Sequence, residues 1–77
     1  WPSNKDAIMW LQSAYDTGKA EIAQVVYLAQ ALNKDKKKKA AVDLLRMVIE
    51  RTPSADNYAS DWEWLKKARR ILKSYDN

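Results

Sequence analysis

Apolar side chains recur every three or four positions along four stretches of this chain, which is the spacing of one face of an α-helix. The charged residues of each stretch fall on the remaining surface. The four apolar stripes are Ala7, Ile8, Leu11, Ala14 and Tyr15; Ile22, Val25, Val26, Ala29 and Leu32; Ala41, Leu44, Leu45, Val48 and Ile49; and Trp64, Leu65, Ala68, Ile71, Leu72 and Tyr75. The pattern predicts an all-α protein in which these stripes close on one another.

Two short connections set the expected packing of the helices. Gly18, the single glycine of the chain, is suited to a left-handed C-terminal cap after the first helix. A turn this short favours an antiparallel pair of helices. Asn33 is expected to end the second helix and Asp35 to cap the third, which Pro53 should stop. The fold class that follows is four short antiparallel helices in a repeat-like bundle of α-hairpins.

Two further signals resemble capping boxes, in which a hydroxyl and a carboxylate satisfy the free N–H groups of a helix start. Ser3 with Asp6 marks the first helix and Ser60 with Glu63 the fourth, with Trp64 at the staple position. The sequence therefore predicts one helical domain over residues 1–77, with helices at about 4–17, 19–32, 36–52 and 60–75.

One short pattern occurs three times along the chain. The run Ala7-x-x-Trp10-Leu11-x-x-Ala14 is matched by the run that begins at Ala41, thirty-four positions later, and by the run that begins at Asp61. A period near 34 residues is typical of helix–turn–helix repeats. Units of that kind bury their apolar faces by stacking on neighbouring units.

The first half of the chain resembles the Sel-like branch of the tetratricopeptide repeats. The residues that carry the resemblance are Ala7, Trp10, Leu11, Ala14, Gly18, Ala20, Glu21, Ala23 and Leu28. The resemblance implies a helical-repeat fragment and an adaptor that binds a protein or peptide. The second half departs from the pattern, because the usual glycines are missing and the connection around residue 34 is short. Family-like helices with tight connections also suggest a computationally designed or assembled helical protein.

The composition removes most catalytic chemistry. The chain has no Cys and no His, so it lacks a thiolate nucleophile, the commonest general base and the commonest metal ligands. Its carboxylates are expected to cap helices or to lie on the surface. The sequence therefore predicts a structural scaffold with no enzymatic activity, no metal and no cofactor. The alternative is the adaptor that the family resemblance implies.

Positive charge is concentrated in the second half of the chain. Residues 1–33 carry two Lys against three acids, and residues 34–77 carry twelve Lys and Arg against seven acids, which gives net charges of −1 and +5. The candidate anion-contacting residues are Lys36, Lys37, Lys38, Lys39, Lys66 and Arg70. A solvated surface is the simpler interpretation, and nucleic acid is disfavoured because no recognition motif is present. No membrane-spanning run or targeting signal is visible, so a soluble chain is expected and its location stays unknown.

Four tryptophans are many for 77 residues. Trp10 and Trp64 are expected to fill the core, since bulky aromatics often do so in small domains. Trp62, Met9 and Tyr27 lie off the apolar stripes and are expected to be exposed. These three are the candidate contacts for a protein or peptide, or for self-association, because exposed apolar groups often mark interfaces. The fold itself is expected to require no partner.

Overall fold

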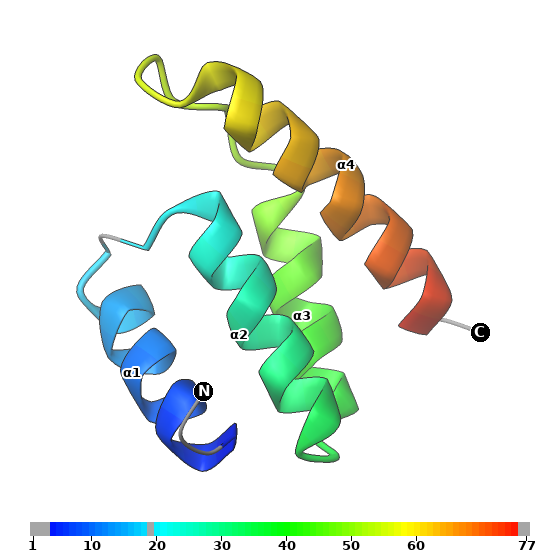
Figure 1. The fold of residues 1–77 in the computed structure, drawn as a ribbon. Helices are drawn as coiled ribbons and strands as arrows, with labels where there is room; N and C mark the ends of the chain where they lie inside the picture. The colour runs from blue at the N-terminus through cyan, green and yellow to red at the C-terminus, as the bar shows by residue number, and fades with distance from the viewer. Residues whose placement is uncertain (1–3, 19, 76–77) are drawn as a thin grey trace.

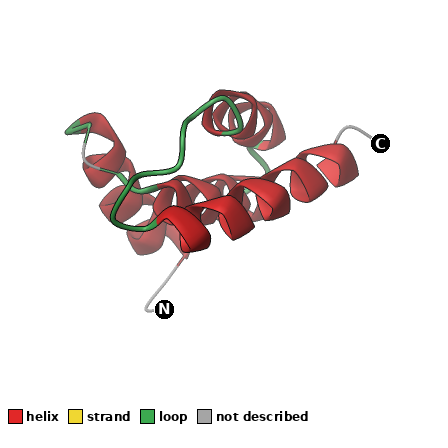
Figure 2. Cartoon of the chain, turned by 90° about the horizontal axis from the view of Figure 1, so that it is seen from above, coloured by secondary structure: helices red, strands yellow, loops and turns green. Residues whose placement is uncertain are grey.

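The computed structural model describes residues 4–18 and 20–75, and within them every regular element is an α-helix (Figures 1 and 2). The helices are α1 (Asn4–Asp16), α2 (Ile22–Lys34), α3 (Lys38–Val48) and α4 (Tyr58–Tyr75). The all-α class predicted from the hydrophobic pattern is confirmed. The expected Ser3 cap of the first helix lies outside the described residues.

The helices form an inner pair and two outer helices. The inner helices α2 and α3 lie side by side, and the chain reverses direction between them as it does between α1 and α2 (Figure 1). Among the helices, the backbone of α1 lies close to that of α2 alone. Helix α4 contacts both α2 and α3 and runs obliquely to them (Figure 1). Helices α1 and α4 therefore lie on opposite sides of α2.

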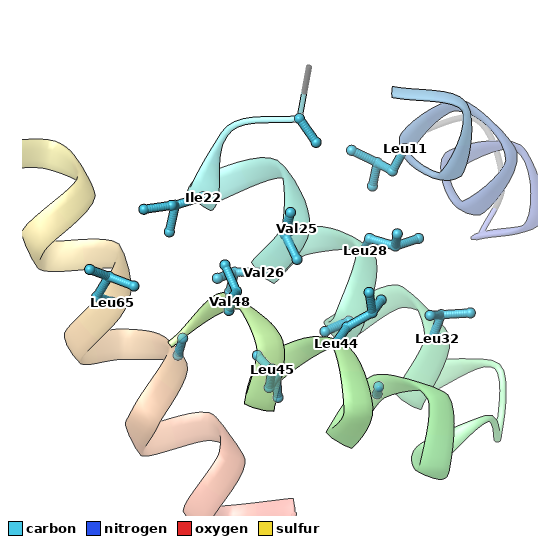
Figure 3. Packing of buried hydrophobic residues seen from close by; sticks show 14 residues of the cluster. Leu11, Ile22, Val25, Val26, Leu28, Leu32, Leu44, Leu45, Val48 and Leu65 are labelled. Atoms are coloured by element: carbon cyan, nitrogen blue, oxygen red, sulfur yellow. The ribbon is translucent and has the colours of Figure 1, made fainter. Parts of the chain in front are cut away.

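The core is a single cluster that draws on all four helices (Figure 3). The inner pair supplies most of it, and its buried residues are Ile22, Val25, Val26, Leu28, Ala29 and Leu32 from α2 with Ala41, Leu44, Leu45 and Val48 from α3. Helix α1 adds Leu11, and α4 adds Leu65 and Ala68. The predicted stripes are confirmed as the buried faces. Leu28, which the stripe of the second helix omitted, is also fully buried.

The connection between α2 and α3 differs from the expectation. Helix α2 continues through Lys34, and Asp35 ends it, because the Asp35 N–H donates to the carbonyls of Ala31 and Leu32. The N–H groups of Lys36 and Lys37 donate to the carbonyls of Asn33 and Leu32, which is the Schellman arrangement. Lys36 adopts the left-handed conformation at φ 65°. The predicted Asp35 cap of the third helix is wrong, and α3 begins two residues later than expected.

Helix α3 ends before it reaches Pro53, the residue that was predicted to stop it. It stops at Val48, and the N–H groups of Glu50 and Arg51 donate to carbonyls three residues back. Such i-to-i+3 bonds tighten the last turn of a helix and end it. The Arg51 guanidinium then donates to the Ala20 carbonyl at 3.0 Å, which ties this connection to the start of α2.

The expected capping box at the start of the fourth helix is also wrong. Helix α4 begins at Tyr58, so Ser60 and Glu63 are exposed positions within it. In the turn that precedes α4, the Ser54 hydroxyl accepts the Asn57 N–H at 3.2 Å. The Ser54 N–H in turn donates to the Asp61 carboxylate at 2.9 Å. Asp61, expected at the surface, is the one buried charged residue of the described chain, and it fixes the preceding loop to α4.

Candidate binding surfaces

An aromatic cluster lies at the surface where α4 meets α2. The rings of Tyr27 and Trp64 meet edge to face, with centroids 4.9 Å apart and an interplanar angle of 63°. The Lys67 ammonium lies over the Trp64 ring, 4.7 Å from its centroid. Tyr27 is 42% exposed. We call Tyr27, Trp64 and Lys67 the aromatic cluster; it presents a ring and a cation side by side to solvent.

The neighbours of the aromatic cluster add positive charge. Lys34 follows Tyr27 by seven positions, so the two lie on the same side of α2, and Lys34 is exposed. Ring pairs of this geometry add roughly 0.5–1.5 kcal/mol beyond area burial, and an exposed cation–π contact adds roughly 0.5–1 kcal/mol. These contacts favour the observed geometry of the cluster, and Lys34 adds a second lysine on the same side of α2 as Tyr27.

A second surface runs along the opposite side of α4 from Trp64. Tyr58, Trp62, Lys66, Arg69 and Lys73 recur every three or four positions, and all five are exposed. Tyr58 is 56% exposed and Trp62 41% exposed. We call these five residues the α4 stripe. It presents two aromatic rings followed by three cations.

The outer face of α1 forms a third surface. Met9 is 72% exposed and Trp10 64% exposed. The expectation that Trp10 fills the core is wrong. Trp10 lies at the edge of the α1 stripe, next to the buried Leu11, and its indole stays largely in solvent while Ala7 and Leu11 are the buried residues of the helix. Trp64, by contrast, is half-buried and packs against the core as predicted.

The candidate anion-contacting residues are all exposed, and they divide between two places. Lys36 to Lys39 lie in the connection before α3 and in its first turn, whereas Lys66 and Arg70 lie on α4. Lys37 pairs with Asp35 at 3.7 Å and Lys66 with Glu63 at 3.5 Å. Exposed pairs of this kind contribute little to stability.

Tyr75 joins the C-terminal end of α4 to the end of α2. It packs against the core, and its hydroxyl forms a hydrogen bond with the Asn33 side chain. Burial raises the pKa of Tyr75 above its ordinary value of 10.0, and the hydrogen bond with Asn33 offsets part of that rise. The contact brings the basic connection before α3 and the basic end of α4 to the same end of the molecule.

The remaining surface offers an open hollow lined by Tyr15, Gly18, Ala20 and Arg51. Arg51 already donates to the Ala20 carbonyl there, and no carboxylate lines the hollow. Over residues 4–18 and 20–75, no group of three acidic side chains is close enough to share a metal ion. No helix in the same part of the chain has the length and apolar character to cross a bilayer.

The exposure predicted for Trp62, Met9 and Tyr27 is confirmed, but the three do not share a surface. They lie on α4, α1 and α2 respectively. Sequence reasoning missed the contact between Tyr27 and Trp64, which are thirty-seven positions apart. Sequence reasoning also missed the left-handed conformation of Lys36. The only signal for that conformation was the position of Lys36 just after the apolar pattern of the second helix ends.

No protein-family model matches this chain, and comparisons with curated proteins and with solved structures find no similar protein. The Sel-like resemblance and the designed origin both stay predictions.

Proposed function

We propose that this chain is a non-catalytic helical scaffold that binds a peptide or an extended segment of a protein through the aromatic cluster. The observation that carries the proposal is the surface pair Tyr27–Trp64 with Lys67 over the indole. Trp and Tyr are enriched among the residues that dominate binding energies. A cluster of that kind supplies contact area at low entropic cost, because its rings are already held in place.

The ligand that fits the aromatic cluster has an apolar or aromatic side chain next to a carboxylate. The apolar group would cover the exposed part of the Tyr27 ring, and the carboxylate would pair with Lys67 or Lys34. No acidic side chain takes part in the described contacts of Trp64 or Tyr27. A carboxylate is therefore drawn to this surface and a cation is repelled from it.

Selection of displayed random peptides against the whole chain tests this proposal. We expect enriched peptides that combine an aromatic or aliphatic residue with Asp or Glu, and we expect Tyr27→Ala and Lys67→Ala each to weaken their binding about tenfold or more. Trp62→Ala is the matched control, because Trp62 has nearly the same exposure as Tyr27 but lies on the other side of α4. The proposal would be contradicted if none of the enriched peptides needed Tyr27 or Lys67 for binding.

A further inference from the structure

The two outer helices expose complementary surfaces on opposite sides of the molecule. Helix α1 presents Met9 and Trp10, and α4 presents the stripe that begins with Tyr58 and Trp62. These four residues are among the six large apolar side chains that are exposed in the described chain; the other two are Tyr27 on α2 and Met47 on α3. Because α1 and α4 share no backbone contact and flank α2 from opposite sides, the two surfaces cannot meet within one molecule (Figure 1).

The charges of the two surfaces are opposite in sign. Helix α1 carries Asp6 and Asp16 against Lys5, which gives this helix a net charge of −1. Residues 64–75 of α4 carry five Lys and Arg and no acid. The helix dipole favours cations only within the last turn, so it does not account for Lys66 or Arg69 in the middle of α4. Those cations lie beside exposed aromatic rings, as at an interface with an acidic and apolar partner.

From this complementarity we propose that copies of this chain associate head to tail, with the outer face of α1 from one copy seated on the α4 stripe of the next. Met9 and Trp10 would cover Tyr58 and Trp62, and the acids of α1 would lie toward Lys66 and Arg69. The contact joins two different surfaces, so it does not close on itself in a dimer and instead extends into chains or into rings of more than two copies. The aromatic cluster on α2 and α4 is not part of it.

The outer face of α1 fits the α4 stripe better than a nucleic acid would. A nucleic acid carries a charge at every nucleotide, including those that would stack on Tyr58 and Trp62. Residues 56–63, which surround those rings, contain three acids and no Lys or Arg. The aromatic end of the stripe therefore favours an apolar group, whereas the far end favours a carboxylate.

Sedimentation of the whole chain over a concentration series tests the proposal. We expect the average mass to rise with concentration past that of a dimer, and the association to weaken as salt is raised, because the ionic part is screened. Met9→Ser and Trp62→Ser each remove a large apolar side chain from one of the two surfaces, and neither variant introduces a charge. Each variant alone should associate about tenfold more weakly or not at all. Tyr27→Ala, the matched aromatic control, should leave association unchanged.

Mixing the two variants distinguishes this geometry from others. The Met9→Ser variant keeps an intact α4 stripe and the Trp62→Ser variant keeps an intact α1 face, so the mixture should give a one-to-one dimer that stops growing. Circular dichroism of each variant separately confirms that it is folded. A chain that stays monomeric at millimolar concentration, an association that ends at a symmetric dimer, or a mixture that does not pair would overturn the proposal.

Added single-stranded oligonucleotide serves as the competing ligand. It should bind more weakly than a second copy and should not depend on Trp62. Tight binding that requires Trp62 would instead assign the α4 stripe to nucleic acid and overturn head-to-tail association.

Discussion

The inner helices differ from the outer helices in how much of their surface is buried. The inner helices are α2 and α3, and the outer helices are α1 and α4. The inner helices contribute ten of the buried residues and the outer helices only five, one of which is the charged Asp61. The outer helices instead expose Met9, Trp10, Tyr58 and Trp62. Stability is thus expected to reside mainly in the inner pair, and recognition on the outer helices and at their borders.

The largest effect is expected from a cavity in the inner pair. Leu45 on α3 is fully buried within the core (Figure 3). Leu45→Ala should lower the free energy of unfolding by roughly 2–5 kcal/mol, since it removes apolar contacts and leaves a void. The counterpart on an outer helix, Met9→Ala, should change it by less than about 0.5 kcal/mol. Urea denaturation followed by circular dichroism measures both, and equal losses would refute the division between inner and outer helices.

The next effect concerns how the outer helix α4 is attached. The Asp61 carboxylate accepts the Ser54 N–H. Asp61→Ala should lower the free energy of unfolding by roughly 1–3 kcal/mol, because the part-buried Ser54 N–H loses its acceptor. Asp61→Asn keeps a carbonyl acceptor and should therefore lower the free energy of unfolding by less than Asp61→Ala does. Thermal unfolding of the two variants tests this, and a larger loss for Asn than for Ala would show that the carboxylate acts in another way.

The two tight connections provide a prediction of opposite sign. Gly18 and Lys36 both adopt left-handed backbone conformations, at φ 74° and φ 65°. An L-residue pays roughly 1–2 kcal/mol in that region and glycine does not. Lys36→Gly should therefore raise the free energy of unfolding by about 0.5–1 kcal/mol.

Gly18→Ala is the matched converse and should lower the free energy of unfolding by about 1 kcal/mol. No atom lies within 4 Å of an added Cβ at Gly18, so this cost is conformational and not steric. For a domain of this size, 1 kcal/mol shifts the melting temperature by roughly 4–8 °C. A lower melting temperature for Lys36→Gly would contradict the expected strain at that lysine.

The smallest effect concerns the far end of α4, where Tyr75 meets α2. Because burial raises the pKa of Tyr75 in the folded state above 10.0, the unfolded tyrosine ionises first as pH increases. The contribution of Tyr75 to stability is therefore fully present below pH 10.0 and is lost as pH rises through the folded pKa.

Tyr75→Phe removes the contribution of Tyr75 to the pH dependence of stability. The melting temperature of the wild-type chain should fall more steeply above about pH 10 than that of the variant. Comparing the two chains cancels the titration of the lysines, which they share. Parallel curves between neutral and alkaline pH would show that Tyr75 is as accessible in the folded chain as in the unfolded one.

Several elements could be predicted from the sequence because their signals are local. The stripes of α2 and α3 follow from a period of three to four residues, and the left-handed Gly18 follows from its chemistry. The start of α4 could not be predicted in the same way. Ser60 with Glu63 matches a capping box locally. In the structure the hydrogen bonds form further upstream instead, where Asp61 accepts the Ser54 N–H and the Ser54 hydroxyl accepts the Asn57 N–H.

The candidate surfaces show the same limit. The sequence alone determined the helical class, most of the residues that turn inward and the exposure of Trp62, Met9 and Tyr27, since each depends on periodicity along one helix. Only the tertiary structure decided that Tyr27 meets Trp64 and that Trp10 remains outside the core. Those outcomes depend on how closely and at what angle two helices pack, which is set by the side chains of both helices together and is not encoded in the spacing of either one.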